Sequence, residues 1–256
     1  MKHLAIGPGA LGYFALLGAL DKLYVDGSLQ DLESISGASA GALVAIMALY
    51  TKFDFREALK ISMKVPISQL KPQIKNLFQT YGLVSQDTMR EMITNVIEPM
   101  TFAELYKLNP IKLHIAAFCI ELNKTFYFSV DTSPTMSIID ALCMSVAVPF
   151  LFSSFKYGPW NYFDGGAVES APCGHLIGQK PEDVLILRLV YKDTFDVSNF
   201  SDYLGFVFNT YLKMRRIYNF PTLHVDLSDA NVLDFGITDT AKIQFYLKGY
   251  NNFHTV

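Results

Sequence analysis

The segment Leu32-Glu33-Ser34-Ile35-Ser36-Gly37-Ala38-Ser39-Ala40-Gly41 decides the fold that this sequence predicts. Its first part, 32–35, reads as a short buried strand, and the apolar run 42–50 that follows the glycines indicates a buried helix. A strand, then Gly-x-Ser-x-Gly, then a helix is the arrangement of a nucleophile elbow. The five-residue pattern alone arises by chance in roughly one chain in ten of this length, so the flanking strand and helix carry the prediction.

The residue types in this turn suit a catalytic serine. Gly37 and Gly41 have no Cβ, so the backbone can pass closely around a cramped turn. The helix that begins beside Ser39 directs free N–H groups toward the place where an oxyanion would form, and Ala40 is the expected donor on this side. We therefore expect Ser39 to be a nucleophile. The alternative is a serine that only caps the helix.

A glycine-rich loop, Gly7–Gly12, follows a predicted strand over residues 2–6 and precedes a predicted helix. Its letters also match Gly-x-Gly-x-x-Gly, the dinucleotide-binding pattern. The second strand, however, ends in 35–37 without the acidic residue that would hold a ribose. Because neighbouring parallel strands end at one edge of a sheet, we expect the loop N–H groups to face Ser39. Nucleotide binding and simple strand–helix packing are the alternatives.

A serine nucleophile needs a base within hydrogen-bonding reach. None of the five histidines lies in a recognisable site motif: His3, His114, His175, His224 and His254. Asp164 is the better candidate, since it ends a predicted strand and precedes the permissive pair Gly165-Gly166. An aspartate with an ordinary pKa near 3.9 is a weak base, but it can serve in a cleft that partly excludes water. The alternative is an ordinary Asp-Gly turn.

Composition and pattern favour one large α/β domain. The chain has 256 residues, of which 51% are hydrophobic and 18% are charged, so a single core is expected. Alternating strands and helices predict a three-layer α/β/α fold with a mainly parallel central sheet. We expect a single domain over 1–256, with a more polar helical segment at 54–108 placed near the site.

Local signals place the other elements. Ser85 and the capping box Thr101-Phe102-Ala103-Glu104 predict helix starts, and Asn123-Lys124 predicts a hairpin turn. Strands are expected at 113–121, 125–129, near Tyr162, at 184–189 and at 223–227, and helices at 137–146, 201–215 and 238–250.

Charge and cysteine usage exclude several classes of function. The net charge is −3 and no basic stripe is present, which excludes a nucleic-acid site; the short cluster Lys213, Arg215 and Arg216 is typical of a solvated helix face. Three scattered cysteines, Cys119, Cys143 and Cys173, form neither a disulfide framework nor a zinc pattern.

The apolar N-terminal run imitates a signal peptide, but the glycines and proline at 7–9 interrupt it. We therefore expect a cytoplasmic protein that contacts membranes peripherally through apolar surface. The sequence indicates no oligomeric state.

Three motifs occur along the chain in this order: the loop Gly7–Gly12, the turn Gly37–Gly41 and the turn Asp164–Gly166. Together they resemble the patatin-like phospholipase family. Further stretches are similar to that family: Ala141–Pro149 with Phe152, Asp164–Pro172 with Ser170 in place of an asparagine, and the final helix ending at Gly249-Tyr250. The resemblance implies a Ser–Asp dyad, Ser39 as nucleophile and Asp164 as base, that hydrolyses lipid acyl esters of the phospholipase A or lysophospholipase type. It implies an acyl-enzyme, no metal, no cofactor, and an oxyanion hole built from the first loop.

The chain departs from the family pattern in that loop. Pro8 replaces a glycine and has no N–H, and Leu11 replaces a basic residue. The oxyanion donors implied by the resemblance are then Gly9, Ala10 and Leu11. These departures leave two alternatives open: a catalytically weak or inactive lipid-binding relative, and an acyltransferase that uses the same serine.

Overall fold

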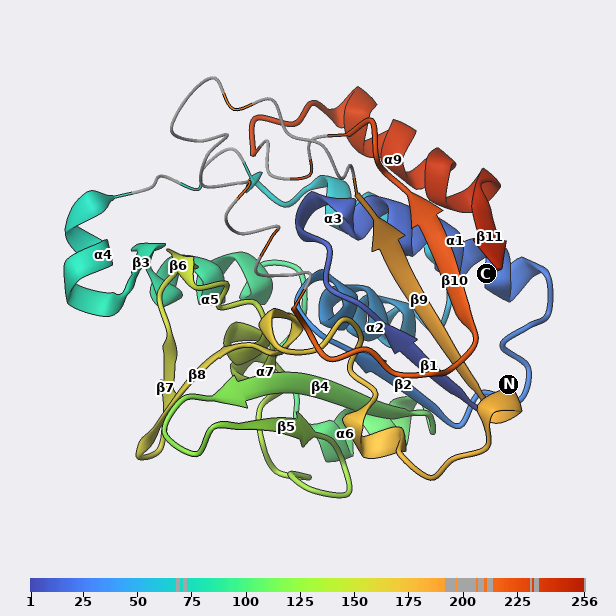
Figure 1. The fold of residues 1–256 in the computed structure, drawn as a ribbon, viewed down its shortest axis with the longest axis horizontal. Coiled ribbons are helices and arrows are strands. Elements are labelled where there is room, and N and C mark those ends of the chain that lie inside the picture. Colours follow the sequence, from blue (N-terminus) through green and yellow to red (C-terminus); the bar gives the residue numbers. More distant parts are fainter. Residues whose placement is uncertain are drawn as a thin grey trace.

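The computed structural model describes residues 1–67, 70, 73–191, 197, 206, 210, 214–230, 232 and 235–255. Within them a nine-stranded sheet has the order β11-β10-β9-β1-β2-β4-β8-β7, with β5 paired to β4 (Figure 1). Its strands are β1 (His3–Ile6), β2 (Ser34–Gly37), β4 (Lys112–Cys119), β5 (Lys124–Phe128), β7 (Phe155–Tyr157), β8 (Trp160–Asp164), β9 (Val184–Val190), β10 (Thr222–Asp226) and β11 (Phe253–Thr255).

The centre of this sheet is parallel, as the alternating pattern predicts. Strands β10, β9, β1, β2 and β4 run in one direction, whereas β5, β7, β8 and β11 pair antiparallel with their neighbours. The α/β fold with a mainly parallel central sheet is therefore confirmed.

Most of the described helices lie on one side of the sheet and share its larger core. They are α1 (Tyr13–Val25), α2 (Ala40–Tyr50), α3 (Phe55–Met63), α5 (Gln86–Thr94), α6 (Phe102–Leu108), α7 (Ile138–Ser145) and α9 (Asp239–Asn251). Helix α4 (Ile74–Thr80) buries no residue and lies at one end of the molecule (Figure 1). The larger core lies between α1, α2, α7 and the sheet, with Leu4, Ile6 and Ile35 pointing into it. The alternate residues Ala5 and Ile186 belong to a smaller core on the other face.

Residues 165–183 cover this second face with short 3-10 turns, among them Gly165–Ala167 and Gly174–Leu176. Ala171, Cys173 and Leu176 from this segment are buried against Ala5 and Ile186. The sheet thus lies between two layers. Cys119, Cys143 and Cys173 are all free and buried, which agrees with the expectation of unpaired thiols.

Most predicted helix starts are found in the structure. The Ser85 side chain accepts from the Thr88 amide at the start of α5, and Thr101 with Glu104 forms the predicted capping box of α6. Four of the described strands were not predicted: β7, β11 and the small parallel pair of β3 (Gly82–Val84) with β6 (Phe150–Phe152). The helix predicted at 201–215 falls almost wholly outside the described residues.

Strands β2 and β8 meet along one edge of β4. Gly37 at the end of β2 lies opposite Ile115, and Asp164 at the end of β8 lies opposite Ala117. Since β2 is parallel to β4 and β8 is antiparallel to it, the two strands run toward each other and their carboxyl ends meet. This topology brings together the turns that follow residues 37 and 164. Among the described helices, none has the length and apolar character needed to cross a membrane.

Candidate active site

Ser39 lies in a strained turn between β2 and α2. Its φ of 56° and ψ of −126° are conformations that residues with a side chain rarely adopt. A Cβ at Gly37 would clash with the backbone of Ala42, and one at Gly41 would clash with the carbonyl oxygens of Ile6 and Gly7. The two glycines of the pattern are therefore required by close backbone contacts on both sides of the serine.

The Ser39 side chain makes no capping hydrogen bond to α2, although the residue occupies the cap position. Ser36, the other serine that could have capped the helix, lies in β2 and its hydroxyl donates to the Leu4 carbonyl at 3.3 Å. The capping interpretation of the motif is thus not supported. Ala40 is the first residue of α2, so its N–H has no acceptor within the helix.

Asp164 ends β8 and is 3% exposed, and Ser39 is 6% exposed. The Asp164 carboxylate accepts a hydrogen bond from the Gly166 amide at 2.7 Å. Burial raises the pKa of Asp164 to about 6; a hydrogen bond from the Ser39 side chain, the Gly166 amide and the charge of Arg215 oppose the rise. An aspartate with this pKa is a stronger base than an exposed one, yet it is largely ionised at pH 7.

The last residue of α7 and a residue just after the helix hold Ser39 and Asp164 by their backbone amides. The Ser145 hydroxyl accepts from the Ser39 amide at 3.0 Å and donates to the Ala116 carbonyl at 2.7 Å. Two residues later, the Ala147 carbonyl accepts from the Asp164 amide at 3.1 Å. Sequence reasoning placed Ser145 in a family-like segment but gave it no role. Its role depends on a contact across 106 residues of chain.

The glycine-rich loop lies beside both turns. A Cβ at Gly166 would stand about 2.5 Å from Pro8, so the proline ring packs directly on the turn after Asp164. The Leu11 amide donates to the Val232 carbonyl at 3.1 Å, which corrects the expectation that Leu11 serves as an oxyanion donor. The Gly7 amide donates to Leu187 in β9, and the Gly12 amide donates to Gly9.

Because the amides of Gly7, Leu11 and Gly12 already donate to carbonyls, Gly9 and Ala10 remain as the candidate oxyanion donors of the loop. Ala10 has a φ of 45°, which lies in the left-handed region, and both residues line the same cavity as Ser39. Ala40 lines the same cavity, and as the first residue of α2 it has an N–H without an acceptor inside the helix, so it joins them as a candidate donor.

Arg215 brings a positive charge to this site, and the prediction of a solvated helix face is wrong for it. Its guanidinium donates to the Gly166 carbonyl at 3.0 Å, and the half-buried side chain lines the cavity with Asp164. Burial lowers the pKa of Arg215, while the nearby Asp164 opposes that change. The neighbouring Arg216 is exposed and its backbone bridges Glu169.

Histidine plays no part in the site among the described residues. His114 and His175 stack on each other with ring centroids 4.4 Å apart, and burial lowers their pKa values to about 4 and about 3. His3 bonds the Ser34 hydroxyl at 2.9 Å. Over the described part of the chain, no cluster of three or more His, Cys, Asp or Glu side chains could hold a metal ion.

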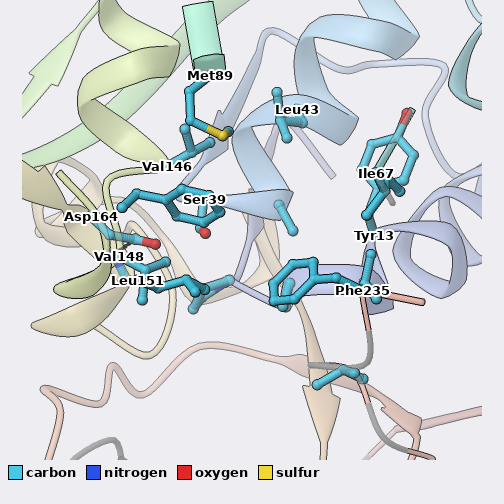
Figure 2. A pocket seen from close by; sticks show the side chains of 18 of the residues that line it. Tyr13, Ser39, Leu43, Ile67, Met89, Val146, Val148, Leu151, Asp164 and Phe235 are labelled. Carbon is cyan, nitrogen blue, oxygen red and sulfur yellow. Dashed lines mark hydrogen bonds between the residues drawn. The ribbon is translucent and has the colours of Figure 1, made fainter. Parts of the chain in front are cut away.

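Ser39 and Asp164 open into an apolar cavity of about 340 Å³ (Figure 2). Figure 2 shows their oxygens turned toward this space, with Leu43, Met89 and Val146 on one side and Leu151 and Phe235 on the other. A polar pair also reaches the cavity: the Tyr13 and Ser62 hydroxyls lie 2.6 Å apart and bond each other. The arrangement joins a buried serine and carboxylate to a space that suits a hydrocarbon chain.

The chain is similar in sequence to viral proteins. A protein named "Probable lipid hydrolase 463L" from Invertebrate iridescent virus 6 is 26% identical over 180 residues, a match that covers 67% of this chain and 61% of that protein. An uncharacterized protein of Acanthamoeba polyphaga mimivirus is 28% identical over 184 residues, covering 67% of this chain and 60% of that protein. The chain thus spans about three fifths of the length of each of these two relatives.

Similarity at the level of structure extends over the whole chain. The crystal structure of VipD from Legionella pneumophila superposes with a TM-score of 0.61 at 16% identity, covering 100% of this chain and 68% of that one. At this identity the likeness concerns the fold. The sequence profile described as "Patatin-like phospholipase" matches residues 4–177, which contain the glycine-rich loop, the serine turn and the Asp164 turn. The chain belongs to the patatin-like phospholipase family.

Proposed function

We propose that this protein hydrolyses acyl esters of lipids, with Ser39 as the nucleophile and Asp164 as the base. The observation that carries the proposal is the meeting of β2 and β8 on one edge of β4, which sets a buried carboxylate beside a strained serine. The apolar cavity in front of them supports a lipid substrate. The name of the iridescent-virus relative points to the same class of reaction.

In the first half of the proposed reaction, Asp164 takes the proton of the Ser39 hydroxyl as the oxygen attacks the ester carbonyl. The carbonyl oxygen becomes an oxyanion, which the N–H groups of Gly9, Ala10 and Ala40 stabilise. The carbon–oxygen bond to the alcohol then breaks. The alcohol leaves with the proton from Asp164, and the acyl group remains on Ser39.

In the second half, water attacks the acyl-enzyme and gives a proton to Asp164. The acid departs, and the proton returns to the Ser39 oxygen. No step needs a metal ion, because Asp164 handles each proton and backbone N–H groups meet each developing charge. The pKa of about 6 for Asp164 suits both directions of transfer near neutral pH.

The cavity supports an acyl chain rather than a polar group as the buried part of the substrate. Apart from the site residues and the Tyr13–Ser62 pair, its lining is almost wholly apolar. Phospholipids and lysophospholipids carry such chains next to an ester. Because these substrates lie in membranes, we include peripheral membrane contact in the proposal.

A panel of phospholipids and lysophospholipids tests the proposal, with released fatty acid as the readout. The wild-type chain should release acid, and Ser39→Ala should abolish release. Ser36→Ala is a matched control, since this buried serine lies three residues earlier and its hydroxyl donates to the Leu4 carbonyl, away from the Ser39 turn. If Ser39→Ala retains the wild-type rate, or no lipid of the panel is cleaved, the proposal is wrong.

The same assay separates the two alternatives. An acyltransferase would deliver the acyl group to an added alcohol or lysolipid faster than to water. A lipid-binding relative without activity would retain acyl chains in the cavity and release no acid. The engaged Leu11 amide and the absent Pro8 N–H are the features that motivate this second alternative.

A further inference from the structure

Four large apolar side chains are exposed together at one end of the molecule. Ile74 and Phe78 on α4 are 72% and 80% exposed, and Tyr81 and Phe150 are each 70% exposed. We call these four residues the α4–β6 patch. Soluble proteins rarely leave several large apolar side chains uncovered side by side, and such surfaces mark sites of contact with proteins or membranes.

The pairing of the short strands β3 and β6 brings the four residues of the patch together. Strand β3 pairs with β6, and Gly82, the residue after Tyr81, lies opposite Phe150. Helix α4 leads into β3 and is held there, because the Gln73 amide donates to the Leu83 carbonyl at 2.8 Å. Figure 1 shows α4, β3 and β6 together at one end of the molecule, with α4 outermost.

The backbone is strained where two of these rings enter the solvent. Tyr81 has a φ of 65° and Phe150 a φ of 67°. Aromatic residues rarely adopt this left-handed region, and holding them there costs free energy. In Phe150 the strained conformation presents an apolar ring to water, where the ring itself gains no packing contact that would offset the strain.

The patch is continuous with the wall of the substrate cavity. Pro149 and Leu151 line the cavity on either side of Phe150, which points outward between them. Ile67 and Leu70 also line the cavity, shortly before α4 begins. A molecule that covers the patch therefore lies against residues that neighbour the cavity lining.

The two sequence segments that carry the patch have an excess of positive charge, which favours an anionic partner. Residues 58–86 contain four lysines and neither Asp nor Glu, and residues 141–163 contain Lys156 and no acidic residue. Lys64, Lys75 and Lys156 are exposed. This local excess contrasts with the net charge of −3 for the whole chain. Lys75 lies on α4 itself, between Ile74 and Phe78. Exposed apolar side chains combined with lysines are typical of proteins that lie on anionic bilayers.

We propose that the α4–β6 patch inserts into the surface of an anionic lipid bilayer, which places the cavity beside the acyl chains of the membrane. The inference rests on the proposed function for its substrate, but binding itself needs no catalysis. Lipid tails would cover the exposed rings, and the lysines would meet the headgroup phosphates and carboxylates. The lipid chain could then pass from the bilayer into the cavity beside Leu151.

Vesicle binding of the Ser39→Ala protein tests this surface without turnover. Sedimentation with vesicles of phosphatidylcholine alone and of phosphatidylcholine with phosphatidylserine gives the partition coefficient. The test variant is Phe78→Gln with Phe150→Asn. Glutamine suits the helix and asparagine tolerates the left-handed backbone, so the fold is retained. Leu108→Ser with Ile177→Ser is the control, since these side chains are 58% and 71% exposed elsewhere.

Binding of the Ser39→Ala parent should be stronger on vesicles with phosphatidylserine and should fall as salt is raised. The patch variant should lose roughly tenfold or more in partition coefficient, since it removes two large apolar side chains. The control pair should bind as the parent does. Equal loss in both pairs, no loss in the patch pair, or no vesicle binding at all would overturn the proposal.

A second copy of the chain could cover the α4–β6 patch in place of a membrane. Light scattering tests this alternative, because it measures the oligomeric state. If the parent is a dimer and the patch variant is a monomer, the patch is covered by protein and the membrane proposal is wrong. Failure of the hydrolase proposal is separate. A chain that binds vesicles through the patch but cleaves no lipid would retain this inference and lose the proposed function.

Discussion

The Ser145 hydroxyl accepts a hydrogen bond from the backbone amide of Ser39 at 3.0 Å. Ser39 is buried in a conformation that its own helix does not stabilise, so its amide would otherwise lack a partner. The Ser145 hydroxyl in turn donates a hydrogen bond to the Ala116 carbonyl in β4, the strand with which both β2 and β8 pair. The serine turn is thereby fixed to the strand that also sets the position of Asp164.

The first prediction concerns this connection. Ser145→Ala leaves the Ser39 amide and the Ala116 carbonyl unpaired in a buried place, so the free energy of unfolding should fall by about 1–3 kcal/mol. The loss of position should lower kcat more than it changes KM, and Ser145→Thr should restore part of kcat.

Ser34→Ala is the control, because it removes another buried hydroxyl that bonds His3 far from the site. It should lower stability without changing kcat. Equal kcat for Ser145→Ala and wild type, measured on a soluble ester, would show that the bond does not position the nucleophile.

The second prediction concerns the pH dependence of activity. Asp164 must be ionised to act as a base, and its pKa lies at about 6. The value of kcat/KM for a soluble ester should therefore fall tenfold per pH unit below about pH 6 and level off above it. A profile that stays flat down to pH 4.5 would exclude Asp164 as the base.

The third prediction assigns part of that pKa to Arg215. The positive charge of Arg215 lowers the pKa of Asp164, so Arg215→Gln should move the acid limb of the profile to higher pH. Glutamine can still donate to the Gly166 carbonyl that Arg215 now contacts. Arg216→Gln, at the exposed neighbouring position, should leave the profile in place. Identical shifts in both variants would show a general charge effect instead.

The fourth prediction concerns chain length. Leu43 lines the cavity one turn along α2 from Ala40, so Leu43→Trp should fill the space that an acyl chain would occupy. The ratio of kcat/KM for a dodecanoyl ester to that for an acetyl ester should fall by at least about tenfold. A constant ratio across chain lengths would mean that the acyl chain binds elsewhere.

The fifth prediction concerns stability in acid. Burial lowers the pKa of His114 to about 4 and that of His175 to about 3, against 6.5 for an exposed histidine. The unfolded chain therefore binds more protons than the folded one as pH falls below about 6.5, and stability is lost down to the folded values. Each histidine contributes a slope of up to about 1.4 kcal/mol per pH unit.

Asp164 acts in the opposite sense, because its raised pKa lets the folded state hold a proton between about pH 4 and 6. Urea unfolding in the Asp164→Asn background removes that contribution. In this background His175→Phe should reduce the loss of stability between pH 6.5 and pH 4.5. The same loss with and without His175 would contradict the assignment.

Local sequence signals predicted the parts of the site that depend on local structure. Glycines two before and two after Ser39 indicated a cramped strand–helix turn, and the structure has that turn. Asp164 was expected at a strand end, where it lies at the end of β8. The alternation of apolar strands and helices was enough for the mainly parallel sheet.

The other features of the site and fold depend on contacts between segments far apart in the chain. The spacing of residues along the sequence does not reveal such contacts. Arg215 looked like part of a solvated helix face, yet it bonds the turn after Asp164, 49 residues away. Leu11 was expected to donate to an oxyanion, but its amide bonds Val232. The short strands β3 and β6 have only three residues each, too few for a periodic pattern, and they pair across the chain.

The most direct test of the Ser39–Asp164 pair is the mass of the intact protein after reaction with a fluorophosphonate. The account predicts one adduct on wild-type protein, located at Ser39 by peptide mapping. It predicts no adduct on Ser39→Ala and labelling slowed by about a hundredfold or more on folded Asp164→Asn. Labelling that persists in Ser39→Ala, or that proceeds at the wild-type rate in Asp164→Asn, would contradict the account.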